Sequence, residues 1–310
     1  MSILPRWNVD PADEQRHQPD GEPLWNESYY MDFVADDESI GGYVRLGLYP
    51  NLGVSWWTTA IVQTGGPTLM SVAYDLGVTP IPALSAKGPS LDVELEVARS
   101  LEDLIVRCSA RAERFDDPAD VYRGISGTED EIGMELQWLT DGVPYHYDVA
   151  TRYEIPCRVG GSIRLGGKEI SITGQGQRDH SWGVRDWWAF DWCWFAARLD
   201  DGRRVHGADI RIPEMRMAFG YVQSQATGVA AIGRLDVTEE LGVEDMPSVG
   251  HAGIDPGDLE LTIEPLAFAP LLLSSADGRM SRFPRAMARF TDASGCRGVG
   301  WVEWNQVQPA

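Results

Sequence analysis

Hydrophobic and polar residues alternate with a period of two along most of this chain, whereas the spacing typical of helices is scarce. Gly-Gly at 166–167 and Asp-Gly at 201–202 separate alternating segments as hairpin turns do, and we interpret 160–161 and 277–278 in the same way. One short helix is expected at 118–124. The expected strands are 42–49, 54–63, 68–75, 91–98, 104–115, 133–139, 150–159, 161–165, 169–173, 192–199, 204–212, 215–223, 229–237, 259–268, 280–291 and 297–307.

Many short strands bounded by turn residues indicate an all-β protein made of antiparallel sandwiches or barrels. We favour barrels, because closure removes exposed sheet edges and leaves an interior that is packed or hollow enough for one ligand. A chain of 310 residues exceeds the size at which one hydrophobic core usually keeps growing. We therefore expect an N-terminal extension at 1–24, a first β domain at 25–145 and a second β domain at 146–310.

The formal net charge of −21 argues against partners that are polyanions, because nucleic acid or an anionic membrane surface would repel this chain. The N-terminal residues lack the basic and apolar regions of a signal peptide, and no apolar run is long enough to span a membrane. We expect a cytoplasmic protein without stable membrane insertion, and the sequence does not indicate its oligomeric state.

The sequence gives no support to a metal or cofactor site. The four cysteines are widely separated, so neither a zinc site nor a disulfide framework is indicated. His206 and Asp209 lie three residues apart without a third ligand nearby in the sequence, and no glycine-rich phosphate loop opens a helix. We expect no cofactor and no metal.

The segment 176–188 concentrates titratable groups among indoles, since five of the twelve tryptophans lie between Trp182 and Trp194. A carboxylate and an imidazole beside large π-faces suit a site that holds an apolar molecule, gives it a proton and stabilises positive charge. A structural core with a tying Asp-His pair is an equally acceptable interpretation. The candidate catalytic residues are Asp179 and His180, and the candidate ligand-binding residues are Trp182, Trp187, Trp192, Trp194, Arg185, Trp57 and Tyr147.

The run Asp179-His180-Ser181-Trp182-Gly183 resembles the Asp-His-x-Trp-Gly signature of the hydroxyneurosporene synthase (carotenoid hydratase) and AttH-like group. The resemblance is best from about Tyr153 to Trp192. It implies two lipocalin-like, or calycin, barrels in tandem. It also implies that Asp179 protonates a terminal carbon–carbon double bond while nearby aromatic rings steady the cation. The residue before the motif is commonly aromatic in the hydratases, whereas here it is Arg178.

Protonation of an alkene requires a carboxyl group that stays protonated in an apolar, aromatic-lined cavity. A guanidinium that reached Asp179 would instead hold the carboxylate ionised, and Arg185 is a more credible partner than Arg178 because adjacent strand residues face opposite sides. Asp179 and His180 would then form a structural latch, or His180 would act as the base of a different proton transfer.

We expect a cofactor-independent acid–base enzyme for an apolar, isoprenoid-like alkene, acting as a hydratase, lyase or isomerase. Hydration, dehydration, isomerisation and cyclisation all fit this chemistry. The alternative is a non-catalytic lipocalin-like carrier or sensor of a hydrophobic small molecule, and a scaffold with filled barrels is a third possibility, because fold does not fix function.

Overall fold

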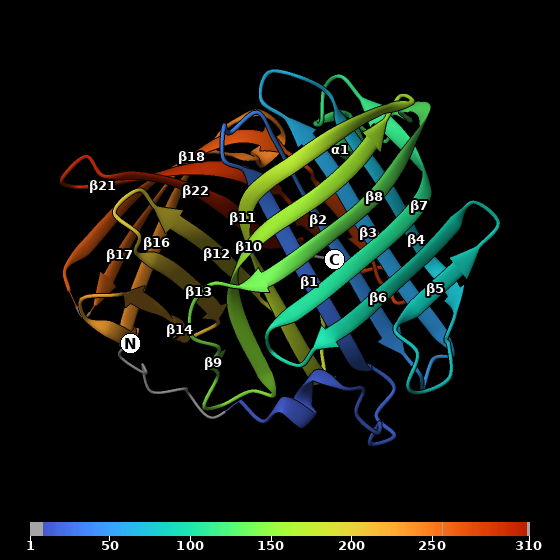
Figure 1. Ribbon diagram of the computed structural model, residues 1–310, viewed down its shortest axis with the longest axis horizontal. Coiled ribbons are helices and arrows are strands. Elements are labelled where there is room, and N and C mark those ends of the chain that lie inside the picture. The colour runs from blue at the N-terminus through green and yellow to red at the C-terminus, as the bar shows by residue number, and fades with distance from the viewer. Residues whose placement is uncertain (1–8, 256, 309–310) are drawn as a thin grey trace. The chain divides into compact units, whose positions relative to one another are not determined.

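The computed structural model describes residues 9–255 and 257–308, and most of this chain is β-sheet (Figure 1). Helix within these residues is confined to α1 (Asp120–Arg123) and to two 3-10 turns, η1 (Pro11–Glu14) and η2 (Val243–Asp245). The expected all-β class is confirmed, and α1 confirms the short helix expected at 118–124. None of the described helices is long and apolar enough to cross a membrane.

The chain forms two compact units, each with an antiparallel sheet of 11 strands. Among the described residues, unit 1 comprises 9–61, 69–114 and 127–185, and unit 2 comprises 62–68, 115–126, 186–255 and 257–308. The first sheet contains β1 (Trp25–Ala35), β2 (Ile40–Tyr49), β3 (Val54–Gln63), β4 (Thr68–Gly77), β5 (Ser85–Gly88), β6 (Leu91–Arg99), β7 (Asp103–Phe115), β8 (Thr128–Thr140), β9 (Tyr145–His146), β10 (Arg152–Leu165) and β11 (Lys168–Val184).

The strands of the first sheet follow the order β4-β3-β2-β1-β11-β10-β8-β7-β6-β5, and β9 pairs with β10 (Figure 1). An additional pairing between β4 and β7 joins the two arms of the sheet. β11 therefore lies between β1 and β10, with antiparallel pairing on both sides. Because β11 is a central strand, the predicted motif lies between two neighbouring strands.

The second sheet has the order β15-β14-β13-β12-β22-β21-β18-β17-β16, with β19 paired to β20 and β20 paired to β22. Its strands are β12 (Asp191–Leu199), β13 (Arg204–Ile212), β14 (Met215–Ser224), β15 (Gly228–Ala231), β16 (Arg234–Leu241), β17 (Pro247–Asp255), β18 (Leu259–Phe268), β19 (Leu271–Ser274), β20 (Met280–Phe283), β21 (Arg285–Asp292) and β22 (Arg297–Gln308).

Each unit has its own hydrophobic core, supplied by alternate residues of its strands. On β6, for example, Leu91, Val93 and Leu95 are buried while the intervening acidic residues are exposed. The core of unit 1 includes the fully buried indoles of Trp57 and Trp138. Burial of one large apolar side chain contributes about 1.5–3 kcal/mol, so these clusters account for much of the folding free energy.

The structure divides the chain at a different place from the expected boundary at 145/146. β10 and β11 were expected in the second domain, but β10 pairs with β8 and β11 pairs with β1. They therefore belong to unit 1, and the chain passes from unit 1 to unit 2 for the last time at 185/186. In the interruption expected at Thr140–Pro144, Thr140 is the last residue of β8, and residues 141–144 form the short connection to β9.

The Gly-Gly at 160–161 was expected to be a turn, and this prediction is wrong. Both glycines lie inside β10, which runs unbroken from Arg152 to Leu165. Gly161 has a φ of +137°, and a Cβ atom there would lie 2.2 Å from the carbonyl oxygen of Glu135 on β8. The glycine therefore permits a close approach of two strands rather than a reversal of the chain. The pair at 166–167 does form the turn between β10 and β11.

Candidate functional site

β11 places the residues of the predicted motif on alternate faces of the first sheet. Its position between β1 and β10 sets the cross-strand neighbours, because His180 pairs in register with Tyr29 on one side and Tyr153 on the other. Tyr29 and Tyr153 belong to the hydrophobic core of unit 1, and Trp182 packs against that core. We call the side of the sheet that carries these residues the core face. Asp179 and Ser181 alternate with them and lie on the opposite face.

The imidazole of His180 is almost completely buried on the core face, and both of its ring nitrogens have partners. Nε2 lies 2.6 Å from Oε1 of Glu27, and Nδ1 lies 3.2 Å from the hydroxyl oxygen of Tyr153. The ring stacks on Tyr29, with centroids 4.0 Å apart and planes inclined by 15°. His180 is thus held by a carboxylate, a phenol and an aromatic face.

The segment before β1 contributes His17 and Glu14 to this site, although it was expected to be an N-terminal extension outside the domains. The His17 ring stacks on Trp182 at a centroid distance of 3.8 Å, and its Nδ1 lies 2.8 Å from Oε1 of Glu27. The backbone amide of His17 donates to the other oxygen of the same carboxylate at 2.7 Å. Glu27 therefore joins two histidines, one from β11 and one from the segment before the sheet.

Glu14 completes the polar side of this cluster and has no exposed surface. It accepts hydrogen bonds from the Tyr153 hydroxyl at 2.8 Å and from Arg178 Nη1 at 2.5 Å. The backbone amide of Leu101 donates to its other oxygen at 2.5 Å. Arg178, which the sequence analysis considered as a partner of Asp179, is therefore paired with Glu14 on the core face.

These contacts outweigh the penalty of burial for both carboxylates. Burial would raise the pKa of Glu14, but the charge of Arg178 and the hydrogen bonds lower that pKa. Burial would likewise raise the pKa of Glu27, but the hydrogen bonds of His17 and His180 lower it. Burial, followed by the charge of Glu14, raises the pKa of Tyr153 well above its ordinary value. The site consequently holds two ionised carboxylates and one neutral phenol.

Asp179 is buried on the opposite face and is paired with a guanidinium. Arg152 Nη2 lies 2.7 Å from Asp179 Oδ2 and 2.7 Å from Glu154 Oε1. Such contacts favour the ionised form of a carboxyl group. Arg185, the arginine favoured from the sequence, lies 3.5 Å from the Ser181 hydroxyl. Burial followed by the charge of Arg152 lowers the pKa of Arg185 to about 10, while the charge of Asp179 acts to raise it, so Arg185 also interacts electrostatically with Asp179. The guanidinium that forms the 2.7 Å ion pair with Asp179 comes from the neighbouring strand.

The remaining candidate residues of unit 1 lie in packed surroundings. Tyr147 is buried, and the Arg152 guanidinium lies 5.6 Å from the centre of its ring. Trp57 has no exposed surface and belongs to the core cluster of unit 1. The Trp57 ring packs in the core, but its buried indole nitrogen has no hydrogen-bond partner among the described residues.

Three of the candidate indoles belong to unit 2. Trp187 and Trp192 lie 5.6 Å apart between ring centres, and each contacts Phe283 edge-on. Trp194 lies 5.4 Å from the ring of His206. These indoles were expected in one pocket with Asp179, whereas they belong to a separate compact unit with its own core.

His17, Glu27 and His180 could also offer ligand atoms to a metal ion, because one such atom from each lies within 4.8 Å of the others. Two ligands of one tetrahedral zinc ion, each about 2.0–2.2 Å from the metal, lie about 3.3 Å apart. The nitrogen–oxygen separations here are 2.6 and 2.8 Å, which are the lengths of charge-assisted hydrogen bonds. The residue types suit zinc, but the arrangement is that of a hydrogen-bonded triad.

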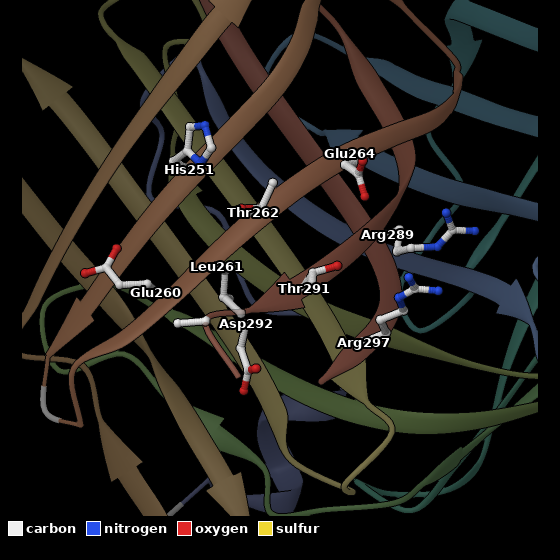
Figure 2. A pocket seen from close by; sticks show the side chains of 10 residues that line it. His251, Glu260, Leu261, Thr262, Glu264, Arg289, Thr291, Asp292 and Arg297 are labelled. Carbon is white, nitrogen blue, oxygen red and sulfur yellow. The ribbon is translucent and has the colours of Figure 1, made fainter. Parts of the chain in front are cut away.

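Unit 2 carries a surface hollow of about 530 Å³ over β17, β18, β21 and the start of β22 (Figure 2). Its lining is mostly polar and includes His251, Glu264, Arg289 and Arg297. Figure 2 shows the Arg289 and Arg297 side chains extending in the same direction. None of the candidate residues lines this hollow, and it lacks the convergence of indoles that the sequence analysis expected of a ligand pocket.

Seven residues of the clusters around His180 and Asp179 were not identified from the sequence, namely Glu14, His17, Glu27, Tyr29, Arg152, Tyr153 and Glu154. The dipeptide Tyr29-Tyr30 amid polar residues was one usable signal for β1, since aromatic residues favour strands. No local signal marks Glu14, because its partners Tyr153 and Arg178 are 139 and 164 residues away along the chain.

The fold is similar to that of several solved proteins. A protein assigned as AttH from Nitrosomonas europaea gives a TM-score of 0.65 with 14% identity over 96% of each chain. Kievitone hydratase from Nectria haematococca gives a TM-score of 0.65 with 11% identity over 98% of this chain and 94% of that chain. CghA gives a TM-score of 0.54 with 11% identity over 96% of this chain and 94% of that chain.

At such identities the likeness shows the fold alone, and it confirms the expected tandem lipocalin-like architecture. No curated protein matches the chain in sequence. A family profile matches residues 10–308, and the chain therefore belongs to the family described as "Domain of unknown function (DUF7064)".

Proposed function

We propose that this chain is a cofactor-independent acid–base enzyme that transfers a proton to an apolar small molecule at the His180 site of unit 1. The observation that supports this most directly is the buried imidazole of His180, held between Glu27 and Tyr153 beside the half-buried indole of Trp182. Imidazole is the side chain best suited to proton transfer near neutral pH. Aromatic faces bind apolar molecules and stabilise positive charge.

In this proposal Asp179 is a latch between β10 and β11 rather than the proton donor that the family resemblance implies. A carboxyl group that protonates an alkene must be neutral before the reaction. Asp179 instead lies 2.7 Å from Arg152, whose positive charge favours the carboxylate. We therefore assign the role of proton donor to His180, the neighbouring residue of the same motif on the core face.

The proposed reaction needs only a proton donor and acceptor, which His180 supplies. A ring nitrogen of His180 gives its proton to one carbon of a double bond, the π electrons form the new carbon–hydrogen bond, and the second carbon becomes a cation. Addition of water and return of its surplus proton to His180 completes a hydration. Loss of a proton from a neighbouring carbon to the neutral His180 ring completes an isomerisation. Attack by a second double bond on the cation closes a ring and forms a new cation, and loss of a proton from a carbon beside that cation to His180 completes a cyclisation. A hydratase among the proteins of similar fold, kievitone hydratase, supports hydration as the first reaction to test.

The proposed substrate is an apolar, isoprenoid-like molecule with a carbon–carbon double bond. An imidazolium is in general a weaker acid than a carboxylic acid. We therefore expect the reacting double bond to be activated by conjugation or by an oxygen substituent, since such bonds accept a proton more readily than an isolated alkene does.

The test is deuterium incorporation from D₂O into a panel of terpenoids, polyenes and prenylated aromatic compounds, followed by mass spectrometry. The wild-type protein should place deuterium on carbon, and His180→Gln should lower the rate at least about 100-fold. The exposed His251 in unit 2 provides a matched control, and His251→Gln should keep the wild-type rate. An unchanged rate in His180→Gln contradicts the proposal.

The same panel separates the enzyme from a carrier. Tryptophan fluorescence that responds to a compound shows binding, and deuterium in that compound shows turnover. Saturable binding without deuterium exchange or product for every bound compound would contradict the enzyme and support a carrier of hydrophobic molecules.

A further inference from the structure

We propose that Glu14 acts through Tyr153 as a positioning residue that keeps hydrogens on both ring nitrogens of His180, so that the segment before β1 sets the protonation state of the site. The inference deepens the proposed function, on which its catalytic meaning rests, because it identifies the form in which His180 waits for a substrate. The structural part rests only on hydrogen-bond distances within unit 1.

The Tyr153 hydroxyl has a single hydrogen to donate. Glu14 is ionised beside Arg178, with Nη1 of the guanidinium 2.5 Å from Oε1, so the carboxylate can only accept. The 2.8 Å contact between Tyr153 and Glu14 therefore requires Tyr153 to donate. The hydroxyl has no second hydrogen for His180, whose Nδ1 lies 3.2 Å from the same oxygen. Nδ1 of His180 must then carry a hydrogen and donate to Tyr153.

The other ring nitrogen of His180, Nε2, faces Glu27. Glu27 already accepts from the backbone amide of His17 at 2.7 Å and contacts Nδ1 of the same residue at 2.8 Å. Its carboxylate is an acceptor, so the 2.6 Å contact with His180 places a hydrogen on Nε2. With hydrogens on both nitrogens, His180 is an imidazolium. The positive charge faces the carboxylate of Glu27 directly, as a buried charge requires.

The surroundings of His180 tolerate this charge. The titratable groups around the ring are Glu27 and Tyr29 from β1, Tyr153 from β10, and Glu14 and His17 from the segment before the sheet. Tyr29 presents its ring face to the imidazolium at 4.0 Å, a cation–π geometry. Positive charge also lies nearby. Arg16 interacts electrostatically with Glu27 and Tyr29, and although burial lowers the pKa of His17, the contacts with Glu27 and Asp13 raise it overall. Arg178 is paired with Glu14.

The hydrogen bonds from Glu14 through Tyr153 to His180 predict a specific effect of Glu14→Gln. The new amide group can donate to the Tyr153 oxygen, and the Tyr153 hydrogen can then turn to His180. Nδ1 of His180 becomes an acceptor, so the ring should change from the imidazolium to the neutral form with its hydrogen on Nε2. A side chain that never touches His180 would thereby control its charge.

The experiment is ¹⁵N NMR of the histidine rings at pH 7 without any substrate, in a chain that has only five histidines to assign. The wild-type spectrum should show hydrogens on both nitrogens of His180, and Glu14→Gln should lose the hydrogen on Nδ1. Tyr29→Phe is the matched control, because it removes a neighbouring hydroxyl but keeps the stacked ring, and it should leave both hydrogens in place.

A wild-type ring with one bare nitrogen, or a folded Glu14→Gln protein that keeps the Nδ1 hydrogen, overturns the inference. Should Glu14→Gln fail to fold, Tyr153→Phe removes the acceptor of the same hydrogen and must give the same loss, and retention there overturns the inference equally. Because no substrate is present, this outcome is independent of turnover. A chain that transfers deuterium with a neutral His180 would keep the proposed function and refute only this inference.

Discussion

Arg152 Nη2 lies 2.7 Å from Asp179 Oδ2, and this ion pair joins β10 to β11 on the face opposite the core of unit 1. The same guanidinium lies 2.7 Å from Glu154, which pairs in register with Asp179. Burial lowers the pKa of Arg152, but the charges of Asp179 and Glu154 raise it well above its ordinary value. One arginine thus offsets two buried carboxylates, which gives Asp179 a structural explanation.

Asp179→Asn should therefore lower the free energy of unfolding while the folded protein keeps its deuterium transfer. The amide removes a charge that faces Arg152, while Glu154 still pairs with that arginine, so we expect the free energy of unfolding to fall by about 1–3 kcal/mol. Urea denaturation at pH 7 measures this change. Asp92→Asn, which breaks the exposed pair with Lys87, should leave the stability unchanged within error. A fully stable Asp179→Asn protein without deuterium transfer would instead identify Asp179 as the acid.

Much of the fold was predictable because burial alternates along many strands. β6 and β8 follow the pattern of one buried and one exposed residue along much of their length. β1 escaped prediction because all of its residues are buried, on both faces, and no alternation marks it. The motif was found, but it was expected beyond a short strand at 169–173, whereas it lies within β11, whose 17 residues extend from Lys168 to Val184.

The site was predictable only in part, because its contacts depend on register between distant strands. Asp179 and His180 were named from the motif, yet their partners Arg152 and Tyr153 are identified only once β10 is aligned with β11. A shift of one residue in that alignment would exchange the two faces and pair different groups. Composition and spacing carry no information on such a register.

Glu14 should make the stability of the protein sensitive to acid. Its ordinary pKa is 4.5 and the contact with Arg178 lowers it in the folded state, so its stabilising effect is complete above pH 4.5 and is lost as the pH falls through the lower, folded-state value. At pH 7, Glu14→Gln should lower the free energy of unfolding by about 3–5 kcal/mol, because it leaves Arg178 buried without its counter-charge.

The measurement is urea denaturation of both proteins at several pH values between 7 and 3. The stability difference between wild type and Glu14→Gln should shrink steadily below pH 4.5. A difference that stays constant over this range would show that the carboxylate of Glu14 is not the stabilising form.

Gly161→Ala should be strongly destabilising, because β10 and β8 approach each other too closely there for a side chain. The new methyl group would lie 2.2 Å from the carbonyl oxygen of Glu135, and the φ of +137° is itself unfavourable for alanine. We expect a loss of at least about 3 kcal/mol in thermal or urea unfolding. Gly166→Ala is the control, since its φ is +52° with no atom within 4 Å of the added carbon, and it should cost only about 1 kcal/mol. Equal losses in the two variants would contradict the close-approach explanation.

Asp32 should make the protein less stable as the pH rises. Its carboxyl group is buried on β1, where Oδ1 accepts from the backbone amide of Gln177 at 2.9 Å and the Tyr30 side chain also forms a hydrogen bond with the carboxyl group. Burial, together with the negative charges of Glu154 and Asp179, raises its pKa well above the ordinary value of 3.8. A raised pKa in the folded state contributes stability that is complete below pH 3.8 and is lost as the pH rises through the folded-state value.

Asp32→Asn imitates the neutral form and removes this dependence. At pH 8 the variant should be more stable than the wild type by about 1–3 kcal/mol, because no buried charge has to form, and the two proteins should converge as the pH falls toward 4. Urea denaturation at pH 4, 6 and 8 measures both trends, with Asp92→Asn as the exposed control. A variant that is less stable than the wild type at pH 8 would show that the Asp32 carboxylate is compensated by its neighbours, and the raised pKa would then be wrong.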